Sequence, residues 1–394
     1  MKGKMRAIKL LCDYEPKKGY RLTNYELTTK KIWDSSSVWR NPRVEMVEVD
    51  IPQIGPRDVL LRVKSCGICG SDLHFIEHDE DNYMLYPGHG RFENTILGHE
   101  LSGIVAEVGS EVVDLKVGDY VTAEEMNWCG ECVACRNGFP NQCERLEEIG
   151  VTYDGGWAEY LVAPAKLCWN INGFKNIYKD EKLLFNVGST IEPNSVAYNA
   201  IFERGGGIRP GQRVVVFGCG PIGLFGISQL KKAGASKLMV FELGEGRRKL
   251  ALEMGADKVF DPAEIEKSGS RMEDVILEET NGQGADFFLE TSGSTEITMP
   301  SILNALNVNA KIILLAWPPK PVPTDFKKMF PRASQIFCSM GHSGNGTFEN
   351  VIRLISAGMI HPEKIITSTY PLSQGLEAIE VAKKREAAKI ILNP

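Results

Sequence analysis

The stretch RVVVFGCGPIG, residues 213–223, decides the fold of the second half of the chain. Residues 214–217 form a continuous run of β-branched and aromatic side chains, as in a strand buried inside a parallel sheet. The run leads into G-x-G-x-x-G, which has its glycines at Gly218, Gly220 and Gly223. This motif alone is a weak signal, but a strand before it and an amphipathic helix after it are the context of a dinucleotide-binding turn.

The residues around the glycines extend this interpretation. Pro221 and Ile222 open the helix, and the strand 237–241 that follows ends at Glu242, nineteen positions after the last glycine. A helix N-terminus attracts phosphates, and an acid at the end of the second strand can bind ribose hydroxyls. We therefore predict NAD as cofactor, preferred over NADP. Arg247 and Arg248 lie nearby and could instead neutralise a 2′-phosphate.

The coarse pattern of the chain predicts two kinds of architecture. Short alternating segments such as 59–63, punctuated by Gly and Pro, indicate a compact, barrel-like all-β unit in the first part. We expect residues 13–43 to form an extended loop or an added hairpin, and residues 169–185 to be loop-like. After the Gly-rich motif, strands alternate with helices, one of them expected over 264–280, which predicts a doubly wound parallel sheet. A strand over 387–392 is expected to close the chain.

Four cysteines form a compact cluster with the spacing C-x2-C-x2-C-x7-C. Four thiols this close in sequence can surround one tetrahedral ion, so the cluster predicts a closed, structural zinc site. An iron–sulfur cluster is the alternative, but the ferredoxin run has a shorter last gap and a proline after its fourth cysteine. The predicted ligands are Cys129, Cys132, Cys135 and Cys143.

A second group of metal ligands is more widely spaced. Cys69, in CGSDLH, and His99-Glu100, in GHE, offer one thiolate, one imidazole and one carboxylate. Three protein ligands with an open fourth position are typical of a catalytic zinc. Their alternative role is that of a small buried cysteine and a surface His-Glu pair. Glu192, just before Pro193, is a candidate further partner, or else an acid that favours the positive end of a helix.

Composition narrows the classes of function. The chain has 394 residues, 43% of them hydrophobic, and a formal net charge of −6, so it has no basic field for nucleic acid. The first 14 residues lack the continuous apolar core of a signal peptide or membrane span. Ten cysteines in a chain without export signals favour metal sites over disulfides. We therefore expect a cytoplasmic protein without a membrane or nucleic-acid partner.

In combination the motifs point to a known family. In chain order they are G-I-C-G-S-D-x-H, G-H-E, the four cysteines, E-P and G-x-G-x-x-G with its following acid. This set resembles the zinc-dependent medium-chain alcohol and polyol dehydrogenases, in particular the sorbitol- and threonine-dehydrogenase group, over nearly the whole chain. The resemblance implies an α/β protein with a GroES-like β-barrel catalytic domain, residues 1–195 and 342–394. A Rossmann NAD-binding domain would span residues 196–341, with the active site between the two.

The resemblance also implies a role for each motif residue. Cys69, His99 and Glu100 would bind the catalytic zinc, with Glu192 as their exchangeable partner. The proton of the alcohol would pass to Ser71 and on to His74, whose alternative role is that of a packed barrel histidine. Two zinc ions per chain follow, one catalytic and one structural. The other implied residues are the structural ligands Cys129, Cys132, Cys135 and Cys143 and, along the cofactor, Thr291 and Ser292.

The implied reaction is hydride transfer from a secondary hydroxyl to NAD. We expect a polyol or cyclitol, with inosose- or inositol-type rings favoured, because Glu124, Glu125 and Asn127 would suit several hydroxyls. Trp128 or Trp157 could cover a ring face. The alternatives are a glucose, aldose or threonine dehydrogenase and, outside enzymes, a non-catalytic NAD-binding zinc scaffold. By analogy, we expect a homo-oligomer, either dimer or tetramer.

Three segments are longer than in short members of the family, namely 12–48, 78–97 and 170–186. They leave the metal assignment intact, although His78 and His89 in the second segment are rival ligands. Substrate contacts lie on loops of this kind, so they cannot be transferred from other members.

Overall fold

The computed structural model describes residues 3–318 and 320–394. Met1 and Lys2, where the first predicted domain begins, and Pro319 lie outside the described residues. The chain divides into two compact units, Met1–Glu192 with Ile366–Pro394, and Pro193–Ile365. The domain boundaries at 195 and 342 stay a prediction, and the contact-based division differs from them chiefly in placing 342–365 with the second unit.

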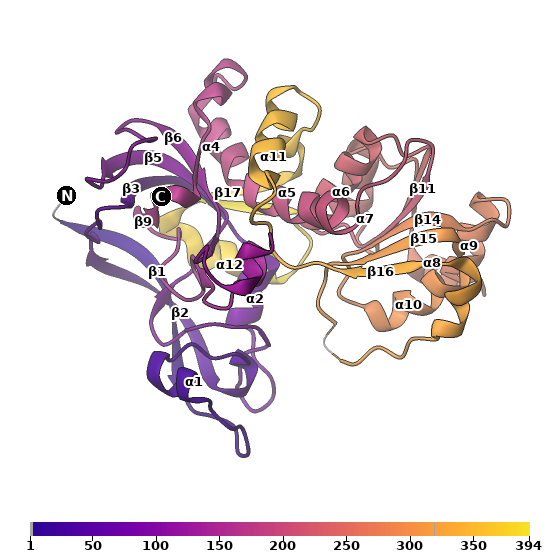
Figure 1. The fold of residues 1–394 in the computed structure, drawn as a ribbon, viewed down its shortest axis with the longest axis horizontal. Coiled ribbons are helices and arrows are strands. Elements are labelled where there is room, and N and C mark those ends of the chain that lie inside the picture. Colours follow the sequence, from indigo (N-terminus) through magenta and orange to yellow (C-terminus); the bar gives the residue numbers. More distant parts are fainter. Residues whose placement is uncertain (1–2, 319) are drawn as a thin grey trace. The chain divides into compact units, whose positions relative to one another are not determined.

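The first unit is built on a curved, mostly antiparallel sheet (Figure 1). Its strand order is β10-β6-β5-β3-β18-β17, and β9 pairs with β3. The alternation seen at 59–63 places Val59, Leu61 and Val63 in the core. The strands are β3 (Asp58–Gly67), β5 (Leu101–Val108), β6 (Tyr120–Ala123), β9 (Tyr160–Pro164), β10 (Cys168–Asn170), β17 (Ile366–Pro371) and β18 (Lys389–Asn393).

A three-stranded sheet of order β2-β1-β4 adjoins it, made of β1 (Lys4–Tyr14), β2 (Trp39–Asp50) and β4 (Thr95–Ile96). Strands β1 and β2 pair in an antiparallel register from Lys4↔Asp50 to Tyr14↔Trp39, so the added hairpin expected over 13–43 is present. Its connection carries a short helix, α1 (Asn24–Thr29), which begins at a capping box of Thr23 and Glu26.

Residues 169–185 were expected to be loop-like, and this prediction is wrong at its start, where β10 includes Trp169 and Asn170, and at its end. Helix α4 (Glu181–Ser189) starts there, capped by Asp180, whose carboxylate accepts the Lys182 N–H at 2.9 Å. Its first turn is polar and its buried residues begin at Leu184, so only the last part of the stretch carries an apolar signal. The extended segment 170–186 is therefore partly helical.

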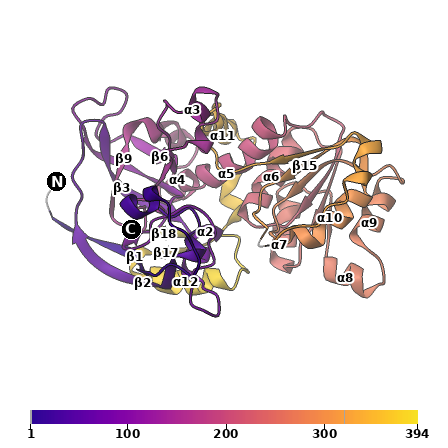
Figure 2. The same cartoon turned by 60° about the horizontal axis from the view of Figure 1, so that its bottom comes forward.

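The remaining helices and strands of the first unit are short. Helices α2 and α12 lie side by side (Figures 1 and 2). The elements are α2 (Gly70–Ile76), β7 (Met126–Asn127), α3 (Val133–Arg136), β8 (Glu147–Glu148), α12 (Gly375–Lys383) and the start of α5 (Ile191–Tyr198), with 3-10 turns at Ser35–Ser37, Pro140–Gln142, Ala165–Leu167, Asn172–Asn176 and Leu372–Gln374.

The second unit contains a six-stranded sheet of order β13-β12-β11-β14-β15-β16, and each of these pairings is parallel. One face packs on α9 and α10 through residues such as Phe288. The next residue, Leu289, instead meets Gly226 of α6, so helices cover both faces. The strands are β11 (Arg213–Phe217), β12 (Lys237–Phe241), β13 (Lys258–Phe260), β14 (Ala285–Glu290), β15 (Leu306–Leu314) and β16 (Gln335–Cys338).

The order of these strands confirms the predicted doubly wound sheet. The single helix expected over 264–280 is wrong, because two helices occupy it. Gly269 breaks the stretch at φ +80°, and Asp274 then accepts the Arg271 N–H to start the next helix. The helices are η5 (Asn199–Arg204), α6 (Pro221–Lys232), α7 (Glu245–Glu253), α8 (Pro262–Lys267), α9 (Met272–Glu279), α10 (Thr295–Asn304) and α11 (Thr347–Ser356), with 3-10 turns at Phe326–Lys328, Phe330–Arg332 and Pro362–Ile365.

Across residues 3–318 and 320–394, none of the helices has the length and apolar character needed to span a membrane.

Candidate active site

Cys69, His99 and Glu100 come together where β3 and β5 pair. Cys69 caps the N-terminus of α2 just after β3, and the other two residues immediately precede β5. Cys66 pairs with Leu101, and the Gly67 N–H donates to the Glu100 carbonyl at 2.7 Å. As a result, one ligand atom from each of the three residues lies within 4.8 Å of the others. One thiol, one imidazole and one carboxyl this close together are a donor set that suits zinc.

Two further acids lie close to the imidazole of His99. Its Nδ1 atom lies 3.6 Å from Asp72 Oδ1 and 3.7 Å from Glu125 Oε1. Asp72 is itself fixed, because its other oxygen accepts the Cys69 N–H at 2.8 Å. A carboxylate behind a histidine sets the tautomer and leaves the other ring nitrogen free to act as a ligand.

Glu100 is held by a residue that the sequence analysis did not single out. The Lys389 ammonium donates to both carboxylate oxygens of Glu100 at 2.6 Å, and both side chains are 1% exposed. Lys389 also donates to the Ile68 carbonyl at 3.2 Å. Gly67 provides the space, since a Cβ there would lie 1.9 Å from Glu100 Oε2. The one signal in the sequence was a lysine inside an otherwise apolar closing strand.

The charges of this cluster are strongly coupled. Burial and the Glu100 carboxylate raise the pKa of the Cys69 thiol. Burial opposes a charge on His99, but Glu125, Asp72 and Cys69 together raise the pKa of His99 well above its usual value. Burial likewise opposes a charge on Lys389, yet Glu100 raises the pKa of Lys389. A metal cation would stabilise the Cys69 thiolate and the acids around it, so the electrostatics of the site fit a bound zinc.

Ser71 and His74 lie one turn apart on α2, the helix that Cys69 caps. The Ser71 hydroxyl lies 3.8 Å from the Cys69 sulfur. His74 is solvent-exposed as a residue, although the burial of its ring and the Arg385 guanidinium lower the pKa of His74. A neutral imidazole near pH 7 can accept a proton. Their role in a proton relay stays a prediction.

Glu192, the candidate further partner, is 3% exposed and begins α5. One of its carboxylate oxygens lies within 4.8 Å of one of Glu125, and its charge helps to raise the pKa of Lys389. It stands beside the group of Cys69, His99 and Glu100 rather than within it. This position suits a partner that exchanges with Glu100 or acts through a water.

The four-cysteine cluster is preformed. One sulfur from each of Cys129, Cys132, Cys135 and Cys143 lies within 4.8 Å of the others. Backbone N–H groups point at the sulfurs, and those of Glu131 and Cys132 lower the pKa of Cys129 to about 6. All ten cysteines of the chain are free thiols. The lobe is thus shaped to hold thiolates around one ion.

The Gly-rich turn in the second unit has the shape that a pyrophosphate needs. A Cβ on Gly223 would lie 2.1 Å from the Gly218 carbonyl oxygen, so α6 starts in contact with β11. Gly218 has φ +88°, and a Cβ there would lie 2.7 Å from Ser292 Cα. A Cβ on Gly220 would meet nothing within 4 Å, which leaves the backbone open to an approaching group. Pro221 and Ile222 form the first turn of α6, as predicted.

The predicted cofactor-binding side chains surround this turn. Glu242 accepts the Cys219 N–H at 2.6 Å and the Gly244 N–H at 2.8 Å, which fixes its carboxylate at the end of β12. Arg247 lies close enough to act on Cys219 electrostatically. Thr291 donates to the Gly218 carbonyl at 3.0 Å, and Ser292 bonds to the buried Glu290. Thr291 and Ser292 therefore shape the turn through the backbone.

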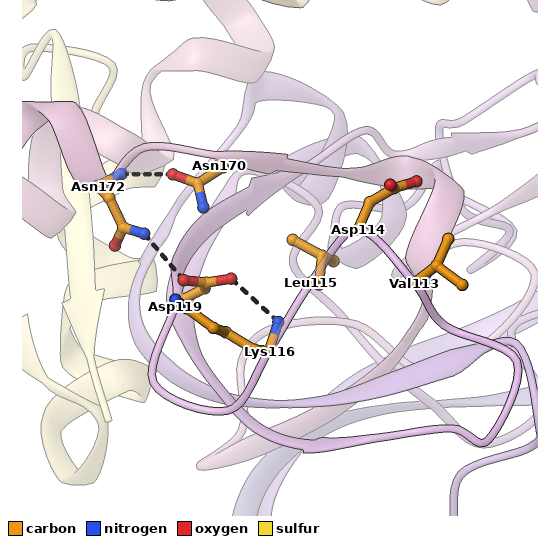
Figure 3. Close-up of a pocket in the computed structure, with 7 residues that line it drawn as sticks. All are labelled: Val113, Asp114, Leu115, Lys116, Asp119, Asn170 and Asn172. Carbon is orange, nitrogen blue, oxygen red and sulfur yellow. Dashed lines mark hydrogen bonds between the residues drawn. The ribbon is translucent and has the colours of Figure 1, made fainter.

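Only some of the residues that were expected to contact the substrate are placed to do so. Glu125 faces His99, but Glu124 is buried and accepts the Trp169 indole N–H at 2.8 Å. Trp157 is fully buried and donates to the Gly67 carbonyl at 3.2 Å, so its ring supports the core and cannot cover a substrate. A separate surface hollow is lined by residues that hydrogen-bond to one another, with Asp119 accepting from Asn172 and from the Lys116 N–H (Figure 3). It contains none of the predicted site residues.

Comparison with known proteins identifies the family. The family model of the alcohol dehydrogenase GroES-like domain matches residues 55–173, and that of the zinc-binding dehydrogenase matches residues 221–357. The chain is 42% identical over 387 residues to scyllo-inosose 3-dehydrogenase of Thermotoga maritima, covering 95% of this chain and 96% of that one. The chain belongs to the zinc-dependent medium-chain dehydrogenase family. It is therefore an oxidoreductase, and the predicted fold class and family are confirmed.

Two other comparisons agree. L-threonine 3-dehydrogenase of Pyrococcus horikoshii is 35% identical over 354 residues, covering 88% of this chain and 94% of that protein. A solved Thermotoga maritima structure superposes with a TM-score of 0.93 at 40% identity, covering 99% of this dehydrogenase and all of that chain. The enzyme thus matches the Thermotoga maritima structure over nearly its full length.

The Lys389–Glu100 pair generates a stability prediction for this dehydrogenase. Lys389→Met leaves a buried carboxylate without its counter-charge and should destabilise the first unit by roughly 3–5 kcal/mol. Lys389→Arg keeps the positive charge and should lower the stability clearly less than Lys389→Met does. Calorimetric melting of the three proteins measures the difference. The double variant Glu100→Gln/Lys389→Met should recover most of the loss, because it removes both charges. A Lys389→Met protein that melts with the wild type would contradict this account.

Proposed function

We propose that this enzyme oxidises a secondary hydroxyl of a polyol or cyclitol, an inosose- or inositol-type ring being favoured, with NAD as hydride acceptor. The observation that carries the proposal is the grouping of Cys69, His99 and Glu100 within 4.8 Å, in a chain 42% identical to a scyllo-inosose 3-dehydrogenase. The donor set supports a zinc-dependent step. The relative supports the substrate class.

In this proposal each residue has a defined task. Cys69, His99 and Glu100 hold the zinc, with Glu192 able to exchange, and a bound zinc supplies Lewis acidity that lowers the pKa of the substrate hydroxyl. Asp72 and Glu125, 3.6 and 3.7 Å from Nδ1 of His99, place negative charge beside its ring. Ser71 accepts the hydroxyl proton and His74 passes it on.

L-Threonine is the second candidate substrate. A relative with this activity is 35% identical over most of the chain. The carboxylates of Glu125 and Glu192, within 4.8 Å of each other, could also bind an ammonium group. An aldose such as glucose is a further alternative within the family. A cyclitol differs from threonine in that it carries no charge and offers several hydroxyls as both donors and acceptors.

We also propose two zinc ions and a preference for NAD. The two ligand groups in the first unit are separate sets of residues, one with three different donors and one with four thiols. In the second unit, Glu242 is fixed by two backbone N–H groups where the ribose hydroxyls would bind. Assembly into a dimer or tetramer and a cytoplasmic location remain predictions.

Metal analysis tests the two zinc sites. The native protein should contain two zinc ions per chain, and mild chelation should remove one together with the activity while the fold persists. Cys69→Ser should abolish turnover and keep most of the stability. Cys132→Ser should lower the melting temperature, because structural zinc contributes folding free energy. Cys338→Ser, at an exposed cysteine outside both groups, is the control and should change neither. One ion in the fully loaded protein would refute the assignment.

Cofactor kinetics test the role of Glu242. We expect NAD to be preferred over NADP by about tenfold or more in kcat/KM, because a 2′-phosphate would meet the carboxylate. Glu242→Gln removes the charge and should narrow that ratio. Glu245→Gln, at an exposed acid paired with Lys249 at 2.7 Å, should leave the ratio unchanged. Equal kcat/KM for both cofactors in the wild type would show that Arg247 outweighs Glu242.

A substrate panel tests the proposed reaction. NAD reduction with scyllo-inosose or myo-inositol should exceed that with ethanol, butanol or threonine by at least about a hundredfold in kcat/KM, the scale of one or two polar contacts that the poor substrates lack. A preference for threonine would establish the second candidate, and a preference for glucose would establish an aldose dehydrogenase. Preference for unbranched primary alcohols would refute the polyol proposal.

A further inference from the structure

The loop 78–97 is fixed in place by the N-terminal hairpin. Ile32 and Gly90 exchange backbone hydrogen bonds of 2.9 Å in both directions, and the Met84 N–H donates to the Trp39 carbonyl at 3.1 Å. On its other side, the Arg91 N–H donates to the Val151 carbonyl at 3.1 Å. The two long segments, 12–48 and 78–97, therefore form one substructure, and the loop has a defined position beside the metal ligands.

The ring of Tyr86, in this loop, is packed against two other aromatic rings. The ring meets Phe75 of α2 edge-on, with centroids 4.6 Å apart, and Phe92 at 6.2 Å. Gly88 leaves room for it, because a Cβ at that position would lie 2.4 Å from Tyr86 Cζ. Helix α2 also carries Ser71 and is capped by Cys69, so the ring is positioned by the element that builds the metal site.

The hydroxyl of Tyr86 lies within electrostatic range of two acids. Burial and then the charges of Glu148, Glu125 and Cys69 raise the pKa of Tyr86 well above the usual value, so the phenol keeps its proton. Over residues 3–318 and 320–394, no hydrogen bond joins this hydroxyl to the protein, and the side chain is partly exposed. Glu148 Oε2 lies 3.4 Å from His89 Nδ1, and Glu125 Oε1 lies 3.7 Å from His99 Nδ1.

A proton donor next to carboxylate acceptors is the arrangement that binds neighbouring hydroxyl groups. Each hydroxyl accepts one hydrogen bond and donates another, so one hydroxyl can accept from the phenol and donate to an acid. A monohydric alcohol cannot use these groups, and a polar group left unpaired on substrate binding costs binding free energy. The ring and its neighbours thus favour a substrate with several hydroxyls.

We propose that Tyr86 is a specificity-determining residue that donates a hydrogen bond to a hydroxyl of a ring polyol, remote from the hydroxyl that reacts at Cys69, His99 and Glu100. This inference rests on the proposed polyol oxidation and deepens it. It assigns a substrate contact to an added loop.

The test compares Tyr86→Phe with Tyr83→Phe, in the zinc-loaded enzyme, on myo-inositol and cyclohexanol. Both substrates are six-membered rings with a secondary hydroxyl, and they differ in the remaining hydroxyls. Tyr86→Phe should lower kcat/KM on myo-inositol about tenfold, the equivalent of one hydrogen bond of about 1.4 kcal/mol. It should leave cyclohexanol within about twofold. Tyr83, in the same loop with its ring under Lys17 at 4.5 Å, should tolerate the change on both substrates.

A binding measurement gives a readout that does not depend on turnover. Titration calorimetry of myo-inositol into the enzyme–NADH complex forms a complex that cannot react. Its Kd should rise about tenfold in Tyr86→Phe and stay unchanged in Tyr83→Phe.

The outcomes separate this inference from the proposed function. Equal losses on both substrates, or no loss of kcat/KM and no change of Kd with myo-inositol, would overturn the role of Tyr86 and leave the polyol oxidation standing. A wild-type enzyme that oxidises myo-inositol no better than cyclohexanol would refute the proposed function, and the inference with it.

Discussion

A charged carboxylate with 1% exposure, Glu100, is the constraint around which the first unit is arranged. Taking such a group out of water costs several kcal/mol unless a counter-charge is in place. Lys389 supplies that charge from β18, the last strand of the chain, which pairs with β3 at Gly67. The pairing of β18 with β3 therefore brings the counter-charge to Glu100, and Gly67 leaves room for the carboxylate.

The sequence predicted those parts of the site whose members lie close together in the chain. The four cysteines span fifteen positions, and the Gly-rich turn with its strand and helix is equally local, so spacing alone carries their geometry. Lys389 was missed because its partner is 289 positions away, and only the strand order brings them together. The prediction for Trp157 was also wrong, because an aromatic residue near a motif can face the core as well as a substrate. Helix α4 was hidden by a polar first turn, where the cap rather than apolar periodicity sets the start.

The pairing of the two added segments with each other could not be predicted from the sequence. Residues 12–48 and 78–97 were recognised as long, but as unconnected departures from a shorter pattern. In the structure they exchange backbone hydrogen bonds at Ile32 and Gly90. They also share an aromatic contact, in which the ring centroids of Trp33 and His89 lie 4.9 Å apart. Nothing in either segment marks the other as its partner, because every non-proline residue offers the same backbone N–H and C=O groups. The substructure they form is therefore visible only in three dimensions.

The metal ligands and the residue proposed to bind the substrate are held mainly by different elements. Cys69, His99 and Glu100 are set by the pairing of β3 with β5 and by Lys389, all within the main sheet. Tyr86 is set by the hairpin, by α2 and by Gly88, and no backbone hydrogen bond of its own joins it to β3 or β5 in the described residues. Helix α2 is the element that the two groups share, because Cys69 caps it and Phe75 packs against Tyr86. Rigid sheet positions fix the chemistry, and a loop anchored beside them can vary in the substrate that it admits.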